Sequence, residues 1–416
     1  INGEGRGDDV SEMRQVGVRG QAGKDAEELD AWARNVFARK IAPMIFPDIR
    51  LIIDAHLQKG HTVAIASSAT RPQIQATAED LGIEDIICTE IAEEDGVLTG
   101  ELASEIRWGQ GKADGVLEFA DEWGIDLEQS FAYSNGAEDL PLLESVGYPC
   151  ALNADDELRA IAKDRGWPAS RLKAPASTSL IDLGRSAAAM GVFVGSVAAA
   201  TGLAVVNRSR SLGANVAASA GSELALAAAG VRLNIVGEEN VWAARPAVFL
   251  FNHQSQLDVF VLAALLRKDF TGVAKKSLEK DPFFGPIGYL ADVAYIDRSN
   301  NAAARKGLEP AVEALHNGRS IAIAPEGTRS PTSRLLPFKK GPFHIAMQAG
   351  VPVVPIVMRN CGEIMAAHSM VIHSGTVDVA VLEPVPTQDW TKDDLDERID
   401  EIRQMYLDTL ADWPSD

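Results

Sequence analysis

The sequence predicts two α/β domains joined by an apolar helical segment. Strand-like apolar runs alternate with helical patterns before residue 168 and again after residue 230, as is typical of mostly parallel sheets. Between these regions, the stretch from Ser186 to Asn207 contains no charged residue. We therefore expect a first domain at 1–168, a linker with apolar helices at 169–229, and a second domain at 230–416.

Composition narrows the classes of function. Of 416 residues, 46% are hydrophobic and 24% charged, with a formal net charge of −20, which fits a folded chain and argues against a nucleic-acid binder. Three widely spaced cysteines give neither a disulfide framework nor a CxxC zinc signature, so we expect an intracellular setting. No signal peptide is visible, and the start at Ile1 instead of Met suggests a fragment.

In the first domain, apolar runs and helical periodicity predict four helices and four strands. The helices are expected at 25–41, 48–57, about 69–81 and 112–123, and the strands at 61–68, 86–89, 97–100 and 130–134. Polar side chains near the carboxyl ends of these strands should converge, because ligands of open α/β sheets bind there. A serine hydroxyl and a lysine suit a phosphate, and an acid beside them suits Mg²⁺. The residues expected at this edge are Ser67 or Ser68, Lys112, Asn135 and Asp139.

These segments resemble motifs of the haloacid-dehalogenase-like phosphatases of the phosphoserine-phosphatase type. Residues 67–70 (SSAT) match the second motif, Lys112 in 109–112 (GQGK) the third, and 133–141 (YSNGAEDLP) the fourth. The family's nucleophilic Asp-x-Asp motif has no match, so it should lie upstream of Ile1 or has been lost. Asn135 also replaces the first acid of the fourth motif. The resemblance implies this fold with a vestigial phosphatase site, and Mg²⁺ only if the domain is active, which we do not expect.

The apolar stretch from Ser186 to Asn207 allows three interpretations. It is long enough to span a bilayer, which takes roughly 20 residues, but it could also form a hairpin in one leaflet or a buried helix. Arg185, Arg208 and Arg210 bracket it, as anionic lipid headgroups would favour. We expect shallow or hairpin association with a membrane, ahead of a single span and then a buried helix.

The second domain again alternates between strands and helices. Strands are expected at 231–236, 247–251, 270–274, 294–299, 320–324 and 351–357, and helices at 302–317 and 338–349. The tail at 391–410 reads as an amphipathic helix that packs on this domain.

The segment 252–258 (NHQSQLD) lies where one strand-like run gives way to a helix-like run. A neutral imidazole such as that of His253 can take a proton from an alcohol, and a carboxylate such as Asp258 can orient the ring. Residues five apart do not share a face of a helix, so His253 must lie on the turn. Alternatively, Ser255 and Asp258 form a capping box, and the segment alone does not separate these interpretations.

Further polar side chains follow the other strands of the second domain. Lys275, Arg298, Glu326 and Arg329 each come at or just after the end of a predicted strand. Cations grouped with one general base suggest an alcohol substrate that carries phosphate, since arginine binds phosphate as a fork and lysine as a point charge. The grouping of these charged residues with His253 favours its interpretation as a catalytic base.

The set is similar to the glycerolphosphate acyltransferase superfamily, and most of all to 1-acyl-glycerol-3-phosphate acyltransferases. Four blocks match in order: 252–258 (N-H-x4-D), 275–298, 325–330 (PEGTRS) and 351–355. Ser277 departs from the family's usual Glu. The order of the two domains resembles bacterial bifunctional proteins with a phosphatase-like domain before an acyltransferase domain.

The resemblance implies acyl transfer from acyl-CoA or acyl carrier protein to lysophosphatidic acid, giving phosphatidic acid at the cytoplasmic face of the cell membrane. It makes His253 the general base and Asp258 its orienting partner, with no metal or other cofactor required. It assigns the remaining substrate-binding roles to Lys275, Arg298, Glu326, Gly327, Thr328 and Arg329. The alternatives are acylation of a different lyso-phospholipid, or a phosphomonoesterase acting through the first domain.

Overall fold

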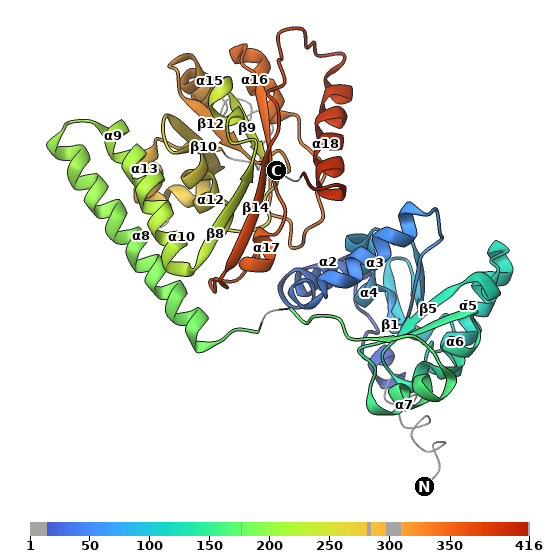
Figure 1. Cartoon of the computed structure of the whole chain (residues 1–416). Coiled ribbons are helices and arrows are strands. Elements are labelled where there is room, and N and C mark those ends of the chain that lie inside the picture. The colour runs from blue at the N-terminus through green and yellow to red at the C-terminus, as the bar shows by residue number, and fades with distance from the viewer. Residues whose placement is uncertain (1–14, 176, 281–283, 297–308, 415–416) are drawn as a thin grey trace. The chain divides into compact units, whose positions relative to one another are not determined.

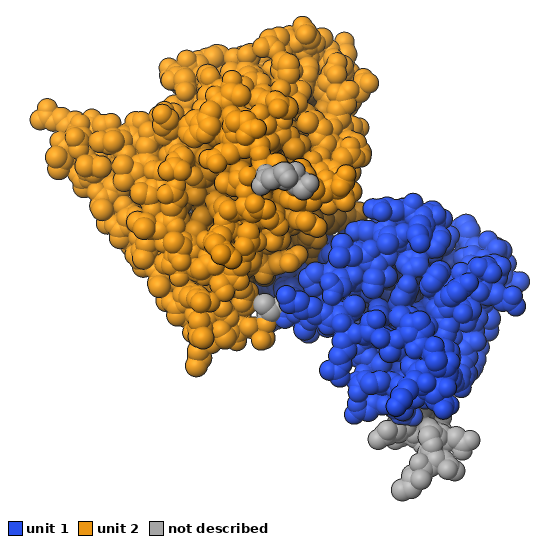
Figure 2. All heavy atoms as spheres, in the orientation of Figure 1, with its two compact units in different colours: residues 1–175 blue, residues 176–416 orange. Residues whose placement is uncertain are grey.

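The computed structural model describes residues 15–175, 177–280, 284–296 and 309–414. The chain (Figure 1) divides into two compact units, residues 1–175 and 176–416, which Figure 2 shows in blue and orange. The segment at 177–229 therefore packs with the second unit.

The first unit is a small α/β fold with parallel strand pairs, as predicted. Strands β1 (Ala64–Thr70) and β2 (Asp85–Thr89) pair in parallel, as do β5 (Phe131–Ser134), β6 (Tyr148–Leu152) and β7 (Ala169–Ser170), whereas β3 (Ile91–Glu94) and β4 (Val97–Leu102) form an antiparallel hairpin. The helices are α2 (Ala26–Val36), α3 (Pro47–Gln58), α4 (Arg71–Leu81), α5 (Gln110–Trp123), α6 (Leu140–Glu144) and α7 (Asp156–Arg165). Leu142, Leu143 and Leu158 centre the core that joins α6 and α7 to the strands.

The second unit is built on a seven-stranded sheet in the order β11-β10-β12-β9-β13-β14-β8. The strands are β8 (Val231–Val236), β9 (Val248–Phe251), β10 (Phe270–Lys275), β11 (Ala294–Ile296), β12 (Ser320–Ile323), β13 (Val353–Met358) and β14 (Gly375–Val381). Only the β13–β14 pairing is antiparallel, so β14 and β8 run opposite to the other five strands. The structure confirms the predicted α/β class, and it adds β14, which the sequence analysis did not predict.

Helices cover both faces of this sheet (Figure 1). Alternation along β9 explains the two layers: Phe249 and Phe251 pack against one helical layer, whereas Val248 and Leu250 pack against the other. The first layer includes α8 (Leu180–Val206), α10 (Ser222–Ala229), α12 (Leu257–Leu266) and α17 (Cys361–Ile364), and the second includes α15 (Glu309–His316), α16 (Gly341–Ala349) and α18 (Leu395–Ala411). Further helices of this unit are α9 (Arg210–Val216), α11 (Asn240–Ala243) and α13 (Phe284–Ala291).

The apolar stretch forms α8, a helix of 27 residues. Among the described residues it is the single helix long and apolar enough to cross a bilayer, and 28% of its most apolar window is buried. Phe193 packs edge-to-face on Phe260 of α12, with ring centroids 4.7 Å apart. The helix α9 approaches α8 closely at Gly213, where a Cβ would lie 2.7 Å from the carbonyl oxygen of Ala200. One side of α8 is thus packed, whereas apolar residues on its other side are exposed.

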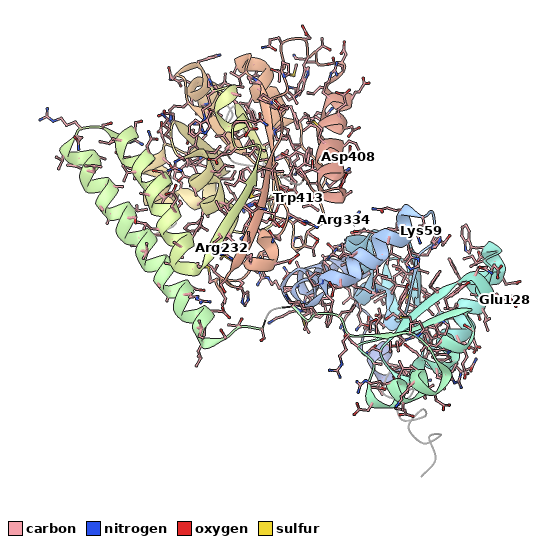
Figure 3. All side chains as sticks on the ribbon, in the orientation of Figure 1. Lys59, Glu128, Arg232, Arg334, Asp408 and Trp413 are labelled. Carbon is pink, nitrogen blue, oxygen red and sulfur yellow. The ribbon has the colours of Figure 1, made fainter. Side chains whose placement is uncertain are left out.

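The C-terminal helix α18 packs on the second unit, as the amphipathic pattern predicted. Leu395, Ile399 and Ile402 are buried in its core, and the hydroxyl of the buried Tyr406 donates to the Leu250 carbonyl oxygen at 2.7 Å. The tail beyond α18 ends near Trp413, labelled in Figure 3, whose ring centroid lies 5.5 Å from the guanidinium carbon of Arg359.

Candidate active site

The polar residues singled out in the second domain follow neighbouring parallel strands. β10, β12 and β9 lie side by side, so their carboxyl ends meet at one edge of the sheet. Lys275 ends β10, the loop 325–330 follows β12, and the turn 252–256 follows β9. Ligands of open α/β sheets bind beyond such an edge. The predicted substrate-binding Arg298 lies outside the described residues.

His253 and Asp258 make direct contact across the turn between β9 and α12. The Nδ1 atom of His253 lies 2.8 Å from Oδ2 of Asp258. The Asp258 side chain is completely buried, whereas that of His253 is 22% exposed. A hydrogen bond from Nδ1–H to the carboxylate leaves Nε2 as the basic nitrogen. The pair therefore has the geometry of a general base held by a buried carboxylate.

The predicted capping box is formed only in part: the N-cap of α12 is Gln256, which makes no side-chain cap bond, but the Asp258 oxygen that contacts His253 also binds the turn. Oδ2 of Asp258 also accepts from the backbone N–H groups of Gln254 and Ser255, at 2.8 and 2.9 Å. These bonds close the turn at the start of α12, as an acid in the first helical turn can do. The same Asp258 oxygen therefore binds the backbone at the start of α12 and the imidazole of His253.

Asn252 ties the turn to the neighbouring strand β13. Its amide nitrogen donates to the Met358 carbonyl oxygen at 2.8 Å, and its amide oxygen accepts from the Met358 N–H at 2.7 Å. The Ser255 hydroxyl donates to the Met365 carbonyl oxygen at 2.6 Å. The sequence analysis predicted neither of these contacts, because their partners lie more than a hundred residues further along the chain.

Glu326 holds the same turn from the other side. Its Oε1 accepts from the backbone N–H of His253 at 2.7 Å, and its Oε2 from the N–H of Leu336 at 2.8 Å. The Ser330 N–H donates to the His253 carbonyl oxygen at 2.7 Å. Both backbone groups of His253 are therefore bound by the loop after β12. Burial raises the pKa of Glu326 to about 7, although the two N–H donors oppose that shift.

The other predicted residues of this loop differ in exposure. Gly327 has φ +71°, and the alkyl chain of Lys339 lies 3.1 Å from where its Cβ would be, so the position suits glycine. Thr328 is exposed, whereas Arg329 donates from Nη1 to the Ala367 carbonyl oxygen at 2.7 Å. Lys275 is exposed at the end of β10. Cations thus surround the edge, with Arg329 anchored and Lys275 exposed to solvent.

A thiol lies near the His253–Asp258 pair. Cys361 is completely buried, with Sγ 3.7 Å from Sδ of Met358. Burial, together with the nearby Asp258 carboxylate, holds the pKa of this thiol well above its usual range. Cys361 therefore stays protonated and cannot act as a nucleophile at neutral pH.

An apolar pocket lies next to the turn, between α8, α10 and α12. It is lined by Met190, Leu226, Leu257, Phe260, Met365 and Met370, among others, and Gln256 of the turn also reaches it. Its cavity volume of about 30 Å³ leaves room for about one or two water molecules.

In the first unit, the structure brings together two of the four predicted vestigial-site residues. Lys112 Nζ lies 2.6 Å from Oδ1 of Asp139, and the Ser134 hydroxyl donates to Oδ2 at 2.7 Å. Lys112 and Asp139 are both buried. The Ser67 hydroxyl accepts from the Ala69 N–H at 3.2 Å.

This set does not fit a magnesium site. Asn135 is neutral, and both oxygens of Asp139 already have partners. Within the described ranges, no group of three or more His, Cys, Asp or Glu side chains could hold a metal ion.

Comparisons with known proteins match both units. Residues 232–359 match the family described as "Acyltransferase", and residues 2–144 match "haloacid dehalogenase-like hydrolase". The chain is 39% identical over 186 residues to "1-acyl-sn-glycerol-3-phosphate acyltransferase" of Saccharomyces cerevisiae, covering 44% of this chain and 61% of the relative. It is 34% identical over 188 residues to the human alpha enzyme of that name, covering 45% and 66%. The chain thus spans about two thirds or less of the length of these relatives.

A solved structure is also similar: "1-acyl-sn-glycerophosphate (LPA) acyltransferase, PlsC, from Thermotoga maritima". The TM-score is 0.48 at 22% identity, covering 57% of this chain and 99% of that one. The two family matches show that the chain combines domains of two different protein families. More particularly, a haloacid-dehalogenase-like domain comes first and an acyltransferase domain second, in the order that the motifs predicted.

Proposed function

We propose that the second domain transfers an acyl group from a thioester to the free hydroxyl of 1-acyl-sn-glycerol-3-phosphate, giving phosphatidic acid. The observation that carries this proposal is the His253–Asp258 pair, held rigidly at the carboxyl edge of the sheet. The names of the relatives support this choice of acceptor.

The chemistry follows from the tautomer that Asp258 imposes. Nε2 of His253 takes the proton of the acceptor hydroxyl as its oxygen attacks the thioester carbonyl carbon. The tetrahedral intermediate then collapses, the C–S bond breaks, and the thiolate leaves with the proton returned by the imidazolium. Asp258 stabilises the imidazolium meanwhile. Acyl-CoA or acyl carrier protein supplies the thioester, and the route needs no covalent acyl-enzyme, metal or other cofactor.

The acceptor brings a phosphate, and the cations of the edge would bind it. Lys275 and Arg329, with Arg298 beyond β11, are the residues proposed for this role. Gly327 and Thr328 would shape the acceptor site beside them. Because Thr328 and Lys275 are exposed, a headgroup can reach them from solvent.

The exposed apolar side of α8 supports association with a membrane. Leu180, Val194, Val205 and Val206 are 86%, 50%, 72% and 82% exposed. A helix this apolar with a packed side and an open side suits shallow insertion into one leaflet, where lipid acceptors reside. We place this surface at the cytoplasmic leaflet of the cell membrane.

The test is release of thiol from acyl-CoA by the purified chain in detergent, with and without lysophosphatidic acid. We expect release that depends on the acceptor and is lost in His253→Ala. Acyl carrier protein as donor and other lyso-phospholipids as acceptors are tested in parallel. A His253→Ala variant that keeps its rate would refute the role of the base, and failure of all pairs would refute acyl transfer.

For the first domain, we propose a structural role without phosphatase turnover. The Lys112–Asp139 ion pair supports this proposal, because it engages the lysine and the acid of the phosphatase motifs with each other. Hydrolysis of p-nitrophenyl phosphate with Mg²⁺ tests it, and measurable turnover that is lost in Lys112→Met would restore the phosphomonoesterase alternative.

A further inference from the structure

We infer that Glu326 is a positioning residue, which fixes the base His253 through its backbone instead of contacting the acceptor. This inference rests on the proposed function of His253. It gives the acid of the PEGTRS block a role different from the acceptor-site role that the family resemblance implies.

The contacts of the carboxylate carry the inference. The two oxygens each accept one backbone N–H, from His253 at 2.7 Å and from Leu336 at 2.8 Å. The first donor belongs to the turn after β9, and the second to the loop that leads towards α16. Glu326 therefore connects the backbone of His253 to that of Leu336, in the loop before α16.

Burial argues against contact with the acceptor. Glu326 is 2% exposed, whereas Thr328, two residues further along, is exposed. Each oxygen of this buried carboxyl group faces a backbone donor, so the side chain is turned towards the protein and away from a substrate hydroxyl. A negative charge at the phosphate site would also repel an anionic headgroup.

The groups that face Glu326 come from three elements. The charge of Asp258 on α12 raises the pKa of Glu326, and that of Arg403 on α18 lowers it. Tyr406 on α18 is buried nearby and has a raised pKa, in part because of Glu326. His253, on the turn after β9, also faces Glu326 and donates its backbone N–H to it. An ionised Glu326 serves both backbone donors, whereas a protonated carboxyl would turn an O–H towards one of them.

Substitution of Glu326 by glutamine tests whether the carboxylate positions His253 or only fills space. Glu326→Gln keeps the shape and one acceptor oxygen, but it places an NH₂ group against one of the two backbone N–H donors. The turn should then shift, and a displacement of about 1 Å of a catalytic group can cost roughly 100-fold in rate. The loss should fall on kcat, because the acceptor does not touch the residue.

The experiment compares wild type, Glu326→Gln and Glu326→Asp with the control Glu383→Gln, an exposed residue after β14. We expect kcat to fall by about 100-fold in Glu326→Gln, with acceptor KM changed less than about twofold. Glu326→Asp keeps the charge but is too short to reach both donors, so its kcat should also fall. A raised acceptor KM with unchanged kcat would overturn the inference in favour of a substrate contact.

A second readout does not depend on activity. In protein labelled with ¹⁵N at its histidines, the Nδ1–H signal of His253, assigned with His253→Ala, reports the bond to Asp258. We expect this signal to move in Glu326→Gln and to stay in place in Glu383→Gln. An unmoved signal in Glu326→Gln would overturn the positioning role, whether or not the wild type transfers acyl groups. Absence of acyl transfer by the wild type, with a signal that moves in Glu326→Gln, would count against the proposed function alone.

Discussion

His253 and Asp258 lie five residues apart and still form a 2.8 Å hydrogen bond, because the chain turns between them. The Asp258 carboxylate draws the turn together by accepting two of its backbone N–H groups at the same oxygen. Orientation of the base is thus inseparable from the start of α12. Five testable predictions follow from this site, from α8 and from the first unit.

Asp258→Asn should reduce kcat by roughly 1000-fold or more, as is usual when the carboxylate that orients a catalytic histidine becomes an amide. The amide can donate to His253 and stabilise the wrong tautomer. Steady-state kinetics with lysophosphatidic acid measure the loss, with the exposed Asp393→Asn as the matched control. A loss below tenfold would mean that Asp258 serves the helix start alone.

Asn252→Ala should destabilise the second unit by about 2 kcal/mol, because the buried N–H of Met358 loses the Asn252 acceptor and its carbonyl oxygen is left with the longer 3.3 Å bond from Gln254. Urea unfolding of the chain measures the change. The comparison is Asn234→Ala, which removes an exposed bond to Asp378 and should cost less than about 0.5 kcal/mol. Equal costs would contradict the anchoring role of Asn252.

Glu326 should make stability depend on pH in the direction opposite to most carboxylates. Its pKa is raised from 4.5 to about 7, so the folded chain keeps a proton that the unfolded chain has lost within that window. The free energy of unfolding should therefore fall as pH rises from 4.5 to 7, by up to about 3 kcal/mol. Urea unfolding of wild type against Glu326→Gln isolates this dependence, and a constant difference across the window would refute it.

Val194→Asp on the exposed side of α8 should weaken binding to vesicles that contain anionic phospholipid. A carboxylate replaces an apolar side chain that is 50% exposed, so the fold loses little while insertion becomes costly. Co-sedimentation with vesicles measures binding. Leu51→Asp, at a 63% exposed position of α3 in the first unit, is the control, and equal binding by both variants would argue against a lipid-facing α8.

Lys112→Met should destabilise the first unit by about 3 kcal/mol, because it leaves the buried charge of Asp139 without its counter-charge. The double variant Lys112→Met with Asp139→Asn removes both charges and should recover part of that loss. Thermal unfolding compares them with the exposed Lys163→Met. No recovery in the double variant would mean that packing of the lysine chain, and not its charge, matters.

Local patterns predicted most of the elements. The strand at Val231–Val236 lies where expected, and α4, α5 and α18 end close to their predicted limits. β14 (Gly375–Val381) and β6 (Tyr148–Leu152) were not predicted. β6 has five residues and contains Pro149, whereas β14 has seven residues and begins with a glycine, and both residue types are uncommon in strands.

The sequence by itself determined that His253 and Asp258 lie on a strand-to-helix turn and that α8 is apolar, because both depend on residues close in the chain. The tertiary structure decided which partners hold that turn. Glu326 and Met358 reach it from 73 and 106 residues further along, through the order of strands β12, β9 and β13. It also decided that α8 packs on one side only, since a local pattern cannot tell a buried face from an open one.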